Sequence, residues 1–85
     1  METRIAVLAI IVKADSGSVS ELNALLSEFS DRIIGRMGIP YRQKGVNIIS
    51  VAVDAPQDDI STLSGKLGKL PGISVKTAYA PSEAQ

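Results

Sequence analysis

The chain of 85 residues contains no cysteine and no histidine. Disulfides are therefore excluded, and so are the usual ligand sets of zinc, haem and iron–sulfur centres. No serine or acidic pair stands at a spacing that indicates a catalytic set, so we expect neither a cofactor nor an enzyme activity. A hard-cation site built from oxygen ligands stays open.

The chain also lacks an excess of charge and a long apolar run. Nine basic and nine acidic residues give a formal net charge of zero, whereas nucleic-acid-binding proteins usually carry a positive excess. We therefore expect no direct nucleic-acid binding. No apolar run reaches the roughly 18 residues of a membrane span, and no signal peptide is visible. We expect a cytoplasmic protein that does not contact a membrane.

Four segments are rich in Ile and Val, and two others carry apolar residues at every third or fourth position. The first pattern is typical of strands and the second of amphipathic helices. Ser18 followed by Glu21 fits a capping box, while Pro71 and Gly72 end the second helix. The sequence predicts strands over residues 4–13, 31–37, 46–54 and 73–79, and helices over residues 18–30 and 56–70.

The resulting order βαββαβ predicts an α+β fold of the ferredoxin-like type in two layers. Two helices would cover one face of a four-stranded antiparallel sheet with strand order 4-1-3-2. Residues 1–80 would form one domain, and residues 81–85 a frayed tail. The segments 4–13 and 46–54 are apolar on both faces, as expected for the central strands of this topology.

Because two helices cover only one sheet face, the other face would expose apolar side chains to water. Such a surface is usually an interface, so we expect a homodimer or homotetramer formed through the sheet. The pattern does not decide which face is covered. Candidate interface residues are therefore taken from both faces: Ile5, Val7, Leu8, Ile48, Ile49 and Val51.

The segment "IIGRMGIPYRQKG", residues 33–45, is basic and rich in glycine on a neutral chain. It can be a long hairpin whose charges lie in solvent. It can equally be a flap that contacts an anionic ligand or a partner chain, because arginine forms paired hydrogen bonds with anions. Gly35, Arg36, Met37, Gly38 and Tyr41 are its candidate ligand-binding residues.

The segment "SGKLGKLPG", residues 64–72, lacks the spacing of a phosphate loop. Ser61, Gly65 and Gly68 instead form a smooth helix face away from the apolar stripe. That face permits close approach of a neighbouring element, a subunit or a ligand. Gly65, Lys66 and Gly68 complete the candidate ligand site.

"IIGRMGIPYRQKGVNIISVAVDAP" and "ISTLSGKLGKLPGISVKTA" together resemble the family of iron-only hydrogenase system regulators over residues 33–78. That family is similar to ACT-like domains and to the C-terminal domain of the nickel-responsive repressor. The resemblance implies a module that oligomerises, binds a small effector and regulates hydrogenase expression or maturation. The turn "DSGS", residues 15–18, resembles the acid-and-glycine turn where ACT domains bind ligands, although a plain turn explains it as well.

Two departures limit what the resemblance implies. The repressor binds nickel through His and Cys, which this chain lacks, so nickel binding does not carry over. Because Met1 lies just ahead of the first predicted strand, we expect no counterpart of the repressor's N-terminal DNA-binding domain. We therefore expect a regulatory module that senses a small anionic effector at a subunit interface. The alternative is a ligand-free module that docks on a regulatory protein partner or on its own copies.

Overall fold

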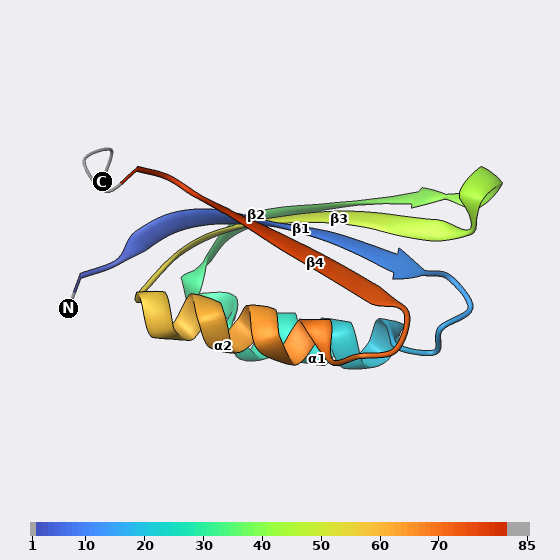
Figure 1. The fold of residues 1–85 in the computed structure, drawn as a ribbon, viewed down its shortest axis with the longest axis horizontal. Coiled ribbons are helices and arrows are strands. Elements are labelled where there is room, and N and C mark those ends of the chain that lie inside the picture. The colour runs from blue at the N-terminus through green and yellow to red at the C-terminus, as the bar shows by residue number, and fades with distance from the viewer. Residues whose placement is uncertain (1, 82–85) are drawn as a thin grey trace.

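Residues 2–81 are described by the computed structural model, in which both helices pack on one face of an antiparallel sheet (Figure 1). In chain order the elements are β1 (Arg4–Lys13), α1 (Val19–Glu28), β2 (Ile33–Tyr41), β3 (Val46–Ala55), α2 (Gln57–Gly68) and β4 (Ile73–Tyr79). The strand order is β2-β3-β1-β4, which confirms the predicted ferredoxin-like fold and its order 4-1-3-2. Residues 82–85 of the expected tail lie outside the described residues.

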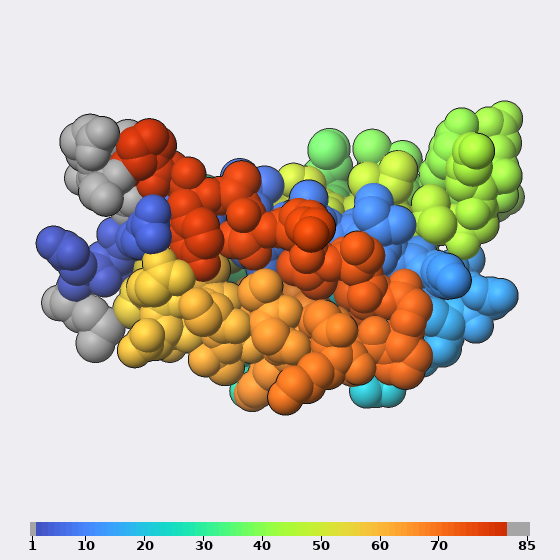
Figure 2. Space-filling view, in the orientation of Figure 1, coloured from blue at the N-terminus to red at the C-terminus, as the bar shows by residue number. Residues whose placement is uncertain are grey.

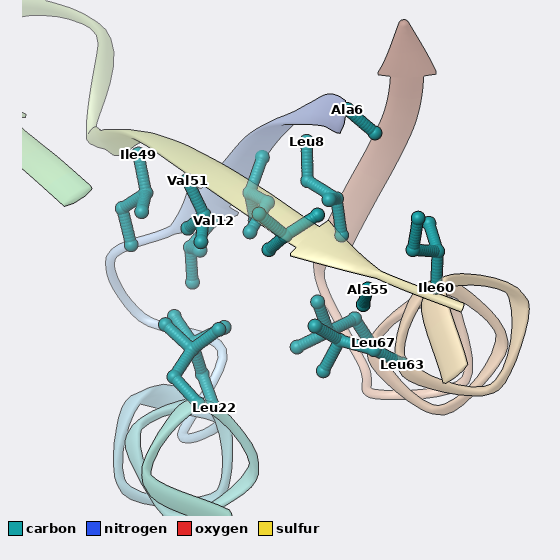
Figure 3. Packing of buried hydrophobic residues seen from close by; sticks show 13 residues of the cluster. Ala6, Leu8, Val12, Leu22, Ile49, Val51, Ala55, Ile60, Leu63 and Leu67 are labelled. Carbon is teal, nitrogen blue, oxygen red and sulfur yellow. The ribbon is translucent and has the colours of Figure 1, made fainter. Parts of the chain in front are cut away.

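Every second side chain of the central strands β1 and β3 points into the layer between sheet and helices (Figure 3). Leu22 and Leu26 of α1 and the stripe of α2 close this core from the other side. Burying one such aliphatic side chain stabilises the fold by roughly 1.5–3 kcal/mol. The core members are Ala6, Leu8, Ile10, Val12, Leu22, Leu26, Ile49, Val51, Val53, Ala55, Ile60, Leu63 and Leu67.

Side chains of β1 and β3 point alternately to the two faces of the sheet, so the residues expected at a subunit interface fall into two groups. Ile5, Val7 and Ile48 lie on the uncovered face and are exposed. Leu8, Ile49 and Val51 lie beneath the helices and are buried within the chain, so they cannot contact a partner across the uncovered face. The strand period of two separates the groups, because neighbouring residues point to opposite faces.

The second strand differs from its predicted extent of residues 31–37. Asp31 lies in a 3-10 turn, and β2 continues through Gly38 and Pro40 to Tyr41. It pairs with β3 from Ile33 opposite Val53 to Tyr41 opposite Val46. This long pairing outweighs the weak strand preference of glycine and proline, and a proline is tolerated on an edge strand. The expected flap is therefore mostly strand.

The hairpin between β2 and β3 closes through a 3-10 turn over Arg42–Lys44 and a left-handed Gly45 with φ of 64°. A bulge between Ile33 and Gly35 interrupts the pairing near the start of β2. The hairpin tip extends beyond the helices at one end of the molecule (Figure 1).

The predicted capping box at the start of α1 does not form. Ser18 is the N-cap residue, but its side chain makes no hydrogen bond to the helix. Its hydroxyl instead donates to the carbonyl oxygen of Pro71 at 2.7 Å, and the residue is 1% exposed. Ser18 therefore joins the start of α1 to the loop that follows α2. Both helices also end about two residues earlier than predicted, at Glu28 and Gly68.

Candidate functional site

A groove of about 220 Å³ lies between α1 and the edge strand β2. Its lining is mainly apolar, with two asparagine side chains among the aliphatic ones. Gly38 keeps the groove open, because a glycine has no side chain to fill the space beside Ile49. The lining residues are Val19, Leu22, Asn23, Gly38, Ile39, Pro40, Asn47 and Ile49. An apolar hollow with a few polar groups is the usual form of a small-molecule site.

Arg36 lies beside this groove. It stands opposite buried Val51 in the β2–β3 register, so its side chain leaves β2 on the helix side of the sheet. One guanidinium N–H donates to the Oδ1 atom of Asn23 at 3.0 Å. Because arginine has five N–H donors in a planar fork, the hydrogen bond to Asn23 orients the group and leaves donors to bind an anion.

The other predicted ligand residues of β2 lie on the opposite face of the sheet. Met37 and Tyr41 alternate with Arg36 and Pro40 along the strand, so they point away from α1, and Gly35 stands opposite Ala52 on that same face. Met37 is 60% exposed. The Tyr41 hydroxyl donates to the Oε1 atom of Gln43 at 2.8 Å. The structure therefore brings Arg36 and Gly38 to the groove, but not Gly35, Met37 or Tyr41.

The predicted α2 residues also lie apart from the groove lining. A Cβ atom built on Gly65 or Gly68 would meet nothing within 4 Å, so the described chain does not require glycine at either position. The Nζ atom of Lys66 is 3.9 Å from the Oε1 atom of Glu28 on α1. These three residues form an exposed helix surface.

Asn23 and Asn47 were missed by sequence reasoning, although each carries a weak signal. Asn23 lies in the middle of α1, where asparagine is a poor helix former, and Asn47 lies in β3, where asparagine is depleted. A polar residue that opposes the local preference can indicate a site. The approach of the two residues to one groove depends on the extent of β2 and its register with β3, which the sequence did not reveal.

Three loops meet at the hairpin end of the molecule. The Lys13 amide donates to Gly72, and the Ala14 amide donates to Gly45, each at 2.9 Å. An open hollow of about 400 Å³ lies among Lys13, Ala14, Asp15, Lys44, Gly45 and Val46. Asp15 of the "DSGS" turn reaches this hollow, whereas Ser18 is directed toward Pro71. Both lysines are exposed, so the hollow is a charged surface rather than an enclosed pocket.

Residues 2–81 contain neither a cluster of metal ligands nor a membrane-length helix. No group of three or more acidic side chains there could hold a metal ion. Neither α1 nor α2 has the length and apolar character that crossing a membrane requires.

The uncovered sheet face carries most of the exposed large apolar side chains. We call it the open face and define it by the side chains that point away from the helices. These are Ile5, Val7, Ala9, Ile11 and Lys13 of β1, Met37, Ile39 and Tyr41 of β2, Val46, Ile48, Ser50, Ala52 and Asp54 of β3, and Ser74, Lys76 and Ala78 of β4. The hairpin end rises above the middle of this face (Figure 2).

Comparison with known proteins supplies the family. Residues 4–77 match the TM1266-like family, described as "Iron-only hydrogenase system regulator, putative". The sequence is 36% identical to that of the uncharacterized protein TM1266 from Thermotoga maritima, and the two structures superpose with a TM-score of 0.91. That match covers 94% of this chain and 100% of the other.

A formyltetrahydrofolate deformylase from Pseudomonas putida KT2440 shares the fold alone, with 20% identity and a TM-score of 0.63. That match covers 91% of this chain and 29% of the deformylase chain. None of the curated proteins compared matches the chain. The match over residues 4–77 and the identity to the whole of one relative show that the chain belongs to the TM1266-like family.

Proposed function

We propose that the protein is a non-enzymatic regulatory module that binds a small anionic effector in the groove between α1 and β2. The observation that carries this proposal is the hydrogen bond from Arg36 to Asn23, a residue that lines an apolar hollow. The family description, an iron-only hydrogenase system regulator, supports a regulatory role in that system. Regulation would then follow from effector binding and not from direct contact with DNA.

The lining restricts the chemistry of the effector. Val19, Leu22 and Ile49 favour a short apolar body, and the amides of Asn23 and Asn47 favour polar groups beside it. Arg36 favours a carboxylate or a phosphate, because either anion accepts two parallel N–H bonds. A hollow of about 220 Å³ suits a metabolite with few heavy atoms rather than a dinucleotide.

The same edge strand connects the groove to the open face. Ile39 borders the groove, and its side chain lies on the open face, where it is 48% exposed. A second chain on the open face and an effector in the groove would therefore both contact β2. This arrangement supports a homodimer or homotetramer in which effector binding and assembly influence each other.

The first test measures thermal unfolding in the presence of small carboxylates and phosphorylated metabolites. A ligand at about 100 times its Kd stabilises the native state by about 2.7 kcal/mol. We expect at least one compound to raise the Tm of the native sequence and to have no such effect on the Arg36→Met variant. Arg42→Met is the matched control, since Arg42 lies in the hairpin turn and not at the groove. An equal shift in both variants would contradict the groove as the site.

The alternative function is a ligand-free docking module for a regulatory protein. The exposed surface around Gly65 and Gly68 favours it, because the described chain makes no use of two costly helix glycines there. Under this alternative no compound shifts the Tm. Substitution of Gly65 would then weaken binding of a purified partner, and substitution of Arg36 would not.

A further inference from the structure

The open face is an exposed apolar surface that the proposed groove does not use. We propose that it binds a second copy of the chain face to face, about a two-fold axis that runs across the strands. Lys13 of each chain would then lie beside Asp54 of the other. This inference rests on the proposed function in one respect, the assignment of the protein to a homo-oligomeric module. It adds the surface through which the dimer forms and the orientation of the two chains.

The face is apolar along β1 from Ile5 to Ile11, and an apolar row crosses it from β1 to β2. Ile11 stands opposite Ile48, and Ile48 stands opposite Ile39, so three aliphatic side chains cross the sheet in one row. Each is at least 40% exposed. A contiguous apolar surface of this kind is rare on a monomer and usually marks an interface.

The size of the face suits a dimer. Four strands of up to ten residues give a footprint of roughly 600 Å², from a rise of about 3.3 Å per residue and a spacing of about 4.8 Å. Each partner of a standard interface buries about 800 Å², and side-chain relief raises the accessible area above the flat footprint. The face is therefore large enough to hold two chains together without another surface.

The alternative of pairing through the β2 edge is disfavoured by the strand itself. The bulge between Ile33 and Gly35 breaks the regular row of backbone groups, and Pro40 has no N–H to donate. Both features are common means by which proteins prevent edge-to-edge pairing. They leave the face, and not this edge, as the surface open to a second copy.

Charge determines the orientation. Lys13 stands opposite Val46 at one end of the face, and Asp54 stands opposite Ile5 at the other. A two-fold axis parallel to the strands would bring the two Lys13 side chains together. An axis across the strands exchanges the ends, so each Lys13 meets Asp54 of the second copy, and a two-fold interface forms this pair twice. Among the described residues, neither side chain forms an ion pair within its own chain.

The centre of the face permits close approach. Ala9 and Ser50 stand opposite each other midway along β1 and β3, and both side chains are small. Lys76 stands beside Ala9 on the edge strand β4. The two-fold axis would therefore bring Lys76 of one chain close to Lys76 of the other. The long stem of each Lys76 can direct its ammonium group to solvent at the rim, so Lys76→Ala should leave the dimer intact or tighten it.

The test is a charge-swap cycle followed by sedimentation equilibrium at low salt. Lys13→Glu and Asp54→Lys should each raise the dimer Kd roughly tenfold or more, because each replaces two attractions with two repulsions. The double variant should recover most of that loss, and salt near 0.5 M should reduce the differences. Asp58→Lys on α2 and Lys69→Glu just after it repeat the charge changes away from the face and should leave the Kd unchanged. Circular dichroism establishes that every variant folds.

Each possible failure has a separate meaning. A double variant that stays as weak as the single ones would overturn the orientation. A dimer that persists after Ile48→Asp would overturn the open face as the interface, and a native chain that stays monomeric would overturn self-association. Tm shifts with ligands and Arg36→Met report on the groove in every case, so a failed dimer would not by itself remove the proposed effector site.

Discussion

Gly72 is the residue whose backbone leaves least room for a side chain. Its φ is 74°, and a Cβ atom there would lie 2.5 Å from the Cβ atom of Ser16. The left-handed conformation alone disfavours an L-residue by roughly 1–2 kcal/mol, and the clash adds to it. We expect Gly72→Ala to lower the free energy of unfolding by about 2 kcal/mol or more, measured by urea denaturation.

Gly45 provides the control for that prediction. Its φ is 64°, but a Cβ atom there would meet nothing within 4 Å. Gly45→Ala should therefore show only the conformational loss of roughly 1–2 kcal/mol. Equal losses at the two positions would mean that the loop after α2 can move away from Ser16.

At this scale the sequence located important residues better than it identified their partners. Ser18 was correctly placed at the start of α1, yet its hydroxyl bonds Pro71, 53 positions away. Gly38 lines the groove and Arg36 hydrogen-bonds Asn23 in its lining, whereas neither asparagine was among the predicted ligand residues. Local preference marks a residue as unusual, but a partner distant in sequence is fixed only by the folded chain.

Among the elements, β1 and β4 have the predicted bounds, because dense runs of Ile and Val identify a strand locally. β2 does not, because Gly35, Gly38 and Pro40 oppose strand formation and only the pairing with β3 overcomes them. The segment that seemed most like a flap is therefore the edge strand. This error also hid the division of its side chains between the groove and the open face.

The second helix offers a prediction at the element scale. Gly65 lies inside α2, is exposed and has free space around its missing side chain. Alanine there should raise the free energy of unfolding by about 0.5–1 kcal/mol, because glycine loses more backbone entropy in a helix. Thermal denaturation measures the gain, and Gly68→Ala at the helix end should give less.

A loss of stability in Gly65→Ala, instead of the expected gain, would indicate that a neighbouring chain approaches this surface closely in the native assembly. Repeating the measurement with Ile48→Asp as a background, at high and low protein concentration, identifies the cause. Since α2 lies on the covered side of the sheet, a loss that persists in this background but disappears on dilution indicates a second contact between chains, separate from the open face. If the loss persists on dilution as well, α2 itself is less regular than its hydrogen bonds indicate.

The whole molecule divides its apolar surface between stability and association. The layer beneath the helices is closed by residues of both helices and both central strands, so the fold does not need the open face. The open face can therefore be tuned for assembly without loss of the core. β2 belongs to both the groove and the open face, and it is the element through which the two could be linked.

This linkage leads to a prediction for the whole molecule. If effector binding orders β2 and strengthens the dimer, then the dimer must bind the effector more tightly than the monomer by the same factor, commonly about 5- to 150-fold. Ile48→Asp, which should give a folded monomer, would then bind the effector more weakly than the native chain, although Ile48 does not line the groove. Titration calorimetry above and below the dimer Kd measures both affinities. Ile11→Asp, a second open-face variant that is also remote from the groove, should give the same loss. Equal affinity in all three proteins would mean that β2 transmits nothing between its two faces, and that assembly and effector binding are independent properties of the fold.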